Sequence, residues 1–240
     1  MAVIVAAGKG KRMRPFTYSL PKPMLEVGGA PILKRSLKTL ASVGIRQVVI
    51  VTGYGRKRVE ALRYPPLKLI YQFNPFFGET NDLMSLWFAR TYLLQKDFLY
   101  LHGDLLYHSN VLRRCIDAPK TTILYDSSGS GMDREAMKVQ VRNGRYVQSS
   151  KKLSSRLSSG EFVGICKFSV ATGRRLMWEA ERLFDESERM AYDTRALNNI
   201  AGDIAIHAVD VAGLPWIEID SPSDFERAER VVLPLIEKAR

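Results

Sequence analysis

Short runs of consecutive apolar residues recur along the first half of the chain, and each has the length of a buried strand. They predict strands at 2–6, 47–52, 67–73, 97–101 and 121–125. Between them, apolar residues at helical spacing predict helices near 31–42 and over 80–94, the second capped by Thr80 or Asn81. This alternation is typical of a mostly parallel sheet with helices on both faces.

The pattern changes after Asp126, where Ser and Gly residues at 127–131 predict a flexible loop. Alternating segments at 137–141 and 145–149 flank Asn143-Gly144, which is a strong signal for a β-hairpin. Further strands are predicted at 162–168, 207–211 and 216–219, and further helices at 170–188 and 223–238. We therefore expect one α/β domain over 1–240 with a Rossmann-like sheet. Its nucleotide-binding half spans about 1–125, and its acceptor-binding half, with the hairpin, about 126–240.

Composition and charge narrow the class of protein. The 240 residues are 46% hydrophobic, enough for a substantial core, and no run approaches the length of a membrane span. Cys115 and Cys166 lack metal-like spacing, so the cytoplasm is the expected compartment. The net charge of +11 fits nucleic acid, an anionic membrane or anionic small substrates. Because no nucleic-acid motif is present, we expect a small anionic substrate and neither of the other two partners; a homo-oligomer stays open.

A glycine loop with several cations directly follows the first strand. Its order is Gly8-Lys9-Gly10-Lys11-Arg12, and Lys22 follows between two prolines. The glycines let the backbone turn tightly and present its N–H groups. Met13 stands where a Rossmann fingerprint has its third glycine, and the Walker A spacing is absent. The loop predicts a site for several phosphates, the alternative being a tight turn with solvated basic side chains.

The segments AAGKGKRM and PKPMLEVGG resemble the N-terminal motif of the nucleotidylyltransferases, which join a nucleoside triphosphate to a phosphomonoester and release pyrophosphate. The likeness covers nearly the whole chain. It is closest to the cytidylyltransferases for phosphocholine-like or inositol-phosphate acceptors in the segments NPFFGETNDLMSLWFAR, AMKVQV, GEFVGICKFS and WIEIDSPSDFERA. The resemblance implies the nucleotide-diphospho-sugar transferase type of fold and CTP as donor. It also implies that Arg12 and Lys22 bind the triphosphate and the acceptor phosphate.

The nucleotide site is assigned to the glycine loop and to two places further along the chain. From the loop and its surroundings we assign Ala6, Ala7, Gly8, Lys9, Gly10, Lys11 and Gly103. Asn81 and Ser85 lie four residues apart, so they share one face of a predicted helix and can meet a base or a sugar hydroxyl. The alternative is that Asn81 caps the helix and Ser85 lies at the surface.

Two aspartates are candidate ligands for Mg²⁺. Asp104 follows a predicted strand, at the edge of the sheet where ligands bind in α/β folds. Taken alone, Asp104 would be interpreted as a cap of the next helix, and the glycine loop favours the metal site. Asp220 could likewise be a cap, and Glu218 and Asp224 are rival carboxylates. The resemblance implies that Asp104 and Asp220 together hold Mg²⁺ as the cofactor.

The acceptor site is predicted mainly from the resemblance. It places Lys151 near the acceptor phosphate, with Lys152 as the neighbouring alternative, and it places Glu161 and Gly164 in the wall of the pocket. Among the aromatic residues, Tyr192 and Trp216 are the best candidates to surround a quaternary ammonium, because each lies near an acid in the sequence. The other aromatic candidates are expected in the core: Trp87, Tyr107 and Tyr125.

The predicted reaction is Mg²⁺-dependent transfer of a cytidylyl group from CTP to a small phosphate or phosphonate acceptor. Arg12 stabilises the leaving pyrophosphate, Lys22 bridges the α-phosphate and the acceptor phosphate, and Lys151 steadies the acceptor. No general base is needed, since a phosphomonoester is already ionised. The alternatives are a sugar-1-phosphate nucleotidylyltransferase with another NTP, a CTP:inositol-1-phosphate cytidylyltransferase, and a catalytically silent nucleotide-sensing domain. A nucleic-acid-binding protein is a further alternative.

Overall fold

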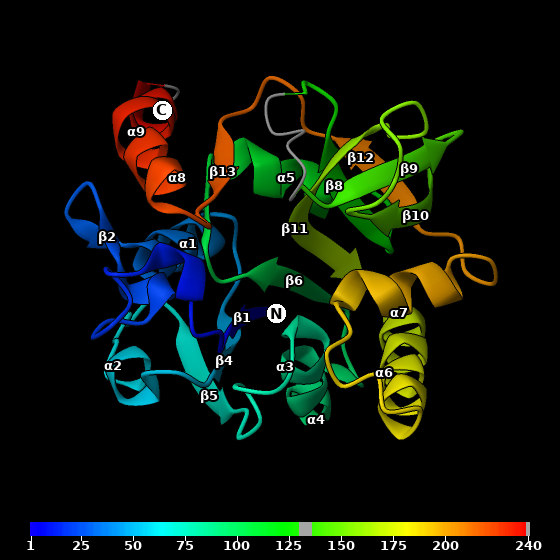
Figure 1. The fold of residues 1–240 in the computed structure, drawn as a ribbon, viewed down its shortest axis with the longest axis horizontal. Helices are drawn as coiled ribbons and strands as arrows, with labels where there is room; N and C mark the ends of the chain where they lie inside the picture. The colour runs from blue at the N-terminus through cyan, green and yellow to red at the C-terminus, as the bar shows by residue number, and fades with distance from the viewer. Residues whose placement is uncertain (130–135, 239–240) are drawn as a thin grey trace.

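The computed structural model describes residues 1–129 and 136–238, which form a central sheet covered on both faces by helices (Figure 1). In order across the sheet, its nine strands are β5 (Lys68–Phe73), β4 (Gln47–Thr52), β1 (Ala2–Ala6), β6 (Phe98–His102), β11 (Gly160–Phe168), β8 (Thr122–Asp126), β12 (His207–Asp210), β10 (Arg145–Ser150) and β9 (Lys138–Arg142). Two smaller ribbons pair β2 (Glu26–Val27) with β3 (Ala30–Pro31) and β13 (Trp216–Glu218) with β7 (Leu105–Tyr107).

The sheet is parallel from β5 to β6 and mixed beyond that point. β4 pairs in parallel with β5 and β1, and β1 pairs in parallel with β6. β11 then runs antiparallel to β6 and β8, and β12 is parallel to β8. The predicted α/β class with helices on both faces is confirmed. The prediction of a mostly parallel sheet is wrong, because β11, β10 and β9 pair antiparallel with their neighbours and make the sheet mixed.

The helices divide between the two faces of the sheet. On one face lie α3 (Asp82–Phe88), α4 (Arg90–Leu93), α6 (Val170–Asp185) and α7 (Asp193–Ile200). On the other lie α1 (Ile32–Ser42), α2 (Arg56–Glu60) and α5 (Ser109–Asp117). Side chains alternate between the two faces along each strand, so β1 contributes to the apolar core on both faces. Val3 and Val5 pack against the helices of the first face, and Ala2 and Ile4 pack against those of the second.

The C-terminal helices form a third apolar cluster at one side of the sheet. It contains α8 (Pro222–Arg227), a π-helical turn at Ala228–Val232 and α9 (Leu233–Lys238), packed on β2 and β13. Ser221 starts α8 through a capping box with Asp224. Of the described helices, none combines the length and apolar character needed to cross a bilayer.

The predicted elements are largely confirmed, with several differences. The predicted helix over 80–94 is interrupted at Ala89, where α3 ends and α4 begins. The helices α2, α5 and α7 and the short strands β2, β3 and β7 were not predicted. The predicted loop at 127–131 extends into residues outside the described ranges. The hairpin is confirmed, and its two turn residues have the positive φ angles that Asn-Gly favours, 50° at Asn143 and 70° at Gly144.

Three chain segments converge at the carboxyl ends of β1 and β6. The glycine loop leaves β1, Asp104 follows β6, and Asp220 follows β13. A Cβ atom on Gly103 would lie 2.6 Å from the carbonyl oxygen of Val5, so only glycine lets the end of β6 approach β1 this closely. The backbone N–H of Ile219 donates to the carbonyl of Asp104 at 3.1 Å, which joins the other two segments.

Candidate active site

Lys22 lies at the centre of the site, between the two predicted aspartates. Its side chain is almost fully buried, and its Nζ atom lies 2.6 Å from Oδ2 of Asp104 and 2.5 Å from Oδ1 of Asp220. The guanidinium of Arg12 reaches the other oxygen of Asp220 at 2.7 Å. Four residues predicted from separate parts of the sequence are thus in direct contact.

The charged groups of this cluster stabilise one another in their ionised forms. Burial alone would lower the pKa of Lys22, but Asp104 and Asp220 outweigh it and raise this pKa. Burial alone would raise the pKa of Asp220, but Lys22 and then Arg12 outweigh it and lower this pKa. The lysine is therefore cationic and Asp220 anionic at neutral pH.

A cleft of about 300 Å³ surrounds the cluster and is formed mainly by the glycine loop and the ends of β1 and β6. Its lining residues are Val5, Ala6, Gly8, Gly10, Lys11, Arg12, Lys22, Pro23, Asn81, Gly103, Asp104 and Asp220. Most of the predicted nucleotide-site residues therefore meet here. Lys9 is not in this lining, and its Nζ atom is 5.7 Å from the ring centroid of Phe77.

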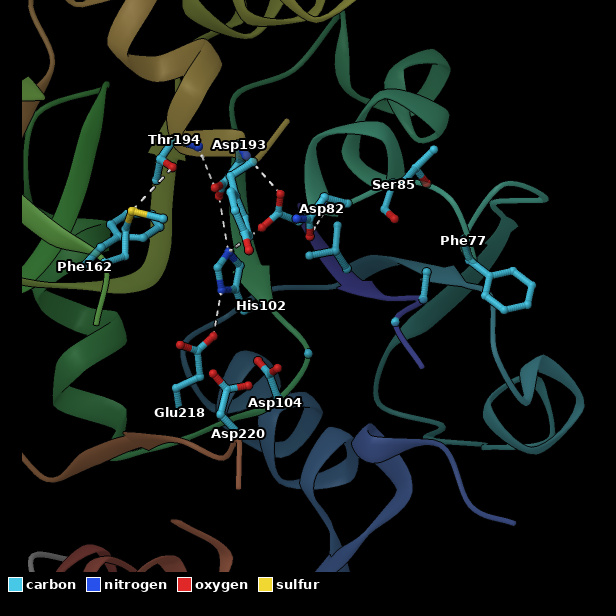
Figure 2. Close-up of a pocket in the computed structure, with 18 of the residues that line it drawn as sticks. Phe77, Asp82, Ser85, His102, Asp104, Phe162, Asp193, Thr194, Glu218 and Asp220 are labelled. Carbon is cyan, nitrogen blue, oxygen red and sulfur yellow. Dashed lines mark hydrogen bonds and ion pairs between the residues drawn. The ribbon is translucent and has the colours of Figure 1, made fainter. Parts of the chain in front are cut away.

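A second pocket of about 220 Å³ adjoins this cleft and shares some of its lining (Figure 2). The residues that line only this pocket are Ala7, Phe77, Thr80, Asp82, Ser85, His102, Met137, Lys151, Phe162, Tyr192, Asp193, Thr194 and Glu218. Ala7, Ser85, Lys151 and Tyr192 were predicted as site residues. The ammonium of Lys151 lies 5.7 Å from the ring centroid of Tyr192.

His102 joins three carboxylates inside the second pocket (Figure 2). Its Nδ1 atom lies 3.1 Å from Glu218, and its Nε2 atom lies 3.2 Å from Asp193 and 3.9 Å from Asp82. Burial alone would lower the pKa of His102, but the hydrogen bonds with Asp193 and Glu218 raise it well above its ordinary value. The ring is therefore an imidazolium that donates from both nitrogens.

Three predicted acceptor residues lie outside the lining of either cleft. The indole Nε1 of Trp216 donates to Asp126 at 2.7 Å. Glu161 is on β11 next to Phe162, and since side chains alternate along a strand, it points away from the face on which Phe162 meets the pocket. Gly164 packs against the ring of His102. The predicted aromatic pair is therefore reduced to Tyr192.

Gly164 positions His102 and does not line the pocket. Its φ angle is +75°, and a Cβ atom there would lie 2.7 Å from Nδ1 of His102. We expect Gly164→Ala to lower the free energy of unfolding by about 1 to 3 kcal/mol through backbone strain and displacement of the ring. Denaturant unfolding measures this change. Gly202→Ala is the matched control, since no atom lies within 4 Å of its added Cβ; equal stability of the two variants would contradict the role of Gly164.

Asn81 and Ser85 both line the pocket, as predicted for site residues, and both also make hydrogen bonds within the local structure. Asn81 lines the pocket and also caps α3, because its side chain accepts from the N–H of Asp82 at 3.1 Å. Ser85 is buried and accepts from the side-chain amide of Asn74 at 3.1 Å, while it also lines the pocket. Both therefore serve the local structure as well as the wall of the site.

Several lining residues were not predicted, above all Asp82, His102 and Asp193. His102 and Glu218 each lie two residues before a predicted aspartate, so their position was a usable signal. No local pattern links Asp82 to Asp193, which are 111 residues apart, yet the N–H of Asp193 donates to Asp82 at 2.9 Å. The fold alone brings them together.

Asp82 destabilises the folded protein in its ionised form. Burial and then the charge of Asp193 raise its pKa to about 8, so a cost to folding begins as the pH rises above the unfolded-state pKa and is complete above the folded-state pKa. At pH 7 most of this cost is present. Asn cannot ionise and keeps the oxygen that accepts from Leu83 and Asp193. We therefore expect Asp82→Asn to raise the midpoint of thermal unfolding at pH 7. The exposed Asp203→Asn is the control, and a lowered midpoint for Asp82→Asn would contradict this account.

Asp104 offers a carboxylate oxygen that a hard divalent cation can bind. Oδ1 of Asp104 is buried and has no hydrogen-bond partner within the described residues, while Oδ2 points at the same lysine as Asp220. Carboxylate ligand atoms of Asp104 and Glu218 lie within 4.8 Å of each other. Oxygen ligands of this kind are those that Mg²⁺ prefers.

The sequence matches the family model of the MobA-like NTP transferase domain over residues 2–200. It is 32% identical over 253 residues to the CMP-5'-(3-aminopropyl)phosphonate synthase of Streptomyces rubellomurinus, covering 100% of this chain and 40% of that protein. It is 27% identical to the 2-aminoethylphosphonate cytidylyltransferase of Lancefieldella rimae, covering 93% of this chain and 89% of the relative. The fold is similar to that of the inositol-1-phosphate CTP transferase from T. maritima, with a TM-score of 0.83, 21% identity, and coverage of 99% and 94%.

These similarities confirm the predicted relationship to nucleotidylyltransferases. The chain spans less than half the length of the Streptomyces relative and most of the length of the Lancefieldella relative. The family model covers well over half of the residues, including the glycine loop, Lys22 and Asp104. This protein is therefore a member of the MobA-like NTP transferase domain family.

Proposed function

We propose that this protein transfers the cytidylyl group of CTP to a small acceptor that carries a phosphate or a phosphonate, with release of pyrophosphate. The observation that carries the proposal is the contact of Lys22 with Asp104 and Asp220 where the two clefts meet. The names of two relatives support it, because both describe joining of a cytidine nucleotide to an aminoalkylphosphonate.

The two clefts suit the two substrates. The glycine loop with Lys11 and Arg12 lines the first cleft, where backbone N–H groups and cations would hold the triphosphate. Phe77 and Ser85 lie on the side of the second pocket away from Asp193 and would contact the base or ribose (Figure 2). The acceptor would occupy the side next to Lys151, Tyr192 and Asp193.

Charge neutralisation and alignment are the chemistry that these residues supply. An oxygen of the acceptor attacks the α-phosphorus of CTP, and the bond from that phosphorus to the β-phosphate oxygen breaks. Both reactants are anions, so fixed cations lower the barrier by offsetting their repulsion. Lys22 contacts the α-phosphate and the incoming oxygen, Arg12 stabilises the leaving pyrophosphate, and Lys151 orients the acceptor. Asp104 and Asp220 would hold Mg²⁺, which when bound adds positive charge at the phosphates.

Pyrophosphate release over a grid of nucleotides and acceptors tests the proposal. CTP, UTP, ATP and GTP are each combined with phosphonates, phosphocholine, inositol 1-phosphate and sugar 1-phosphates. We expect fast release with CTP and a small phosphate or phosphonate. Release with UTP and a sugar 1-phosphate in its place would overturn the assignment of donor and acceptor. No release with any pair would overturn the proposed activity.

A further inference from the structure

One wall of the second pocket carries three carboxyl groups, although the chain as a whole carries a net charge of +11. Asp82, Asp193 and Glu218 lie around the ring of His102. Each of the four side chains lies in the wall of the pocket. A wall with several carboxyl oxygens around one histidine suits a hydrogen-bond donor and not a phosphate.

The ligand atoms of this cluster are arranged so that a further cation can bind. Carboxylate oxygens of Asp82 and Asp193 and a ring nitrogen of His102 lie within 4.8 Å of one another. Both ring nitrogens of His102 already donate to carboxylates, so the ring offers no lone pair to a metal. A group that donates hydrogen bonds to both aspartates is the complementary ligand.

A buried hydroxyl lies beside the cluster but not in the lining of the pocket. Tyr100 is fully buried, and its ring centroid lies 5.6 Å from that of His102. Burial and then the charges of Asp193 and Asp82 raise the pKa of this hydroxyl, so it stays protonated beside them. Burial and then the charge of Asp193 also raise the pKa of Asp82, and an ammonium bound next to this carboxyl group would lower it.

We infer that the acceptor carries a primary ammonium at the end opposite its phosphate or phosphonate, and that Asp82 and Asp193 bind this ammonium. The inference rests on the proposed function and names the substrate class of the same pocket. Of the aromatic residues considered for a quaternary ammonium, only Tyr192 lines the described part of the pocket, and Lys151 already lies over its ring. An ammonium that donates hydrogen bonds to carboxylates fits this wall better than a trimethylammonium, which donates none.

A pair of acceptors that differ only at the distal end tests this inference. In 2-aminoethylphosphonate an ammonium occupies the place of the terminal methyl group of propylphosphonate. With CTP and the parent protein, we expect kcat/KM to be at least about 100-fold higher for the amine. In Asp193→Asn and Asp82→Asn this preference falls to about 10-fold or less, mainly through KM for the amine, while KM for CTP is unchanged. Asp203→Asn is the control and keeps the parent preference.

The outcomes separate this inference from the proposed function. If the parent protein uses propylphosphonate as well as the amine, or prefers an N-trimethylated acceptor, the inference is overturned and cytidylyl transfer stands. If both aspartate variants keep the 100-fold preference for the amine, Asp82 and Asp193 do not bind the ammonium, and the inference is overturned. If no phosphonate or phosphate supports pyrophosphate release, the proposed function itself fails. Asp193 is buried and accepts from the N–H of Thr194, so the more exposed Asp82 provides the test if Asp193→Asn does not fold.

Discussion

Replacing Lys22 by Ala is expected to lower kcat/KM for cytidylyl transfer by about a thousand-fold or more. The lysine lines the first cleft, and its Nζ atom lies within 2.6 Å of Asp104 and Asp220, which line both clefts. Without it, the attacking and receiving phosphate groups lose a buried ammonium that offsets their repulsion. The rate of pyrophosphate release, measured at saturating CTP over a range of acceptor concentrations, gives this change in kcat/KM. The control is Lys38→Ala, at an exposed position on α1.

Stability must be followed in the same experiment. Removing one partner of a buried ion pair leaves unpaired charge and costs about 3 to 5 kcal/mol in comparable sites. If Lys22→Ala does not fold, the double variant Lys22→Met with Asp220→Asn removes one carboxylate together with the lysine. Turnover within about 10-fold of the parent rate in a folded Lys22 variant would remove this residue from the mechanism.

Asp104→Asn is expected to lower the rate by about 100-fold to 1000-fold and to weaken its dependence on Mg²⁺. Oδ1 of Asp104 is buried and unpaired within the described residues, and Oδ2 contacts Lys22. Asn retains one oxygen in nearly the same place but loses the charge that a divalent cation requires. Asp104→Asn therefore tests the negative charge of this side chain while its size stays nearly the same.

A magnesium titration of pyrophosphate release measures this effect. The parent rate should rise with Mg²⁺ and saturate, whereas the variant should need a much higher concentration. Exposed Asp117→Asn, at the end of α5, is the control and should follow the parent curve. An unchanged titration in Asp104→Asn would show that this carboxylate does not hold the metal.

The parts of the site that could be predicted from sequence are those whose residues lie close to a strand end. Lys22 was marked by its flanking prolines and the preceding glycine loop, and Asp104 by the strand before it. The ends of parallel strands meet at one edge of a sheet, which places Asp104 beside the glycine loop. Lys22 lies well beyond the end of β1, and its role at this place was implied by the resemblance. The structure brings them into direct contact.

The acceptor pocket could not be predicted in the same way. Its acidic wall joins Asp82 at the start of α3 with Asp193 at the start of α7, a helix that was not predicted. Trp216 was favoured because it is near Asp220 in sequence, but its indole is held by Asp126. Closeness along the chain does not decide which way a side chain points, and only the three-dimensional packing does.

The central claim is that an oxygen of the acceptor attacks the α-phosphorus of CTP. Isotope labelling of that oxygen tests the claim most directly. The acceptor phosphonate is labelled with ¹⁸O, and the purified product is examined by ³¹P NMR. We expect the phosphorus derived from CTP to show the isotope shift of one ¹⁸O, because the bridging oxygen comes from the acceptor. A joined product without ¹⁸O on that phosphorus, or CMP formed by hydrolysis in place of a joined product, would contradict the account.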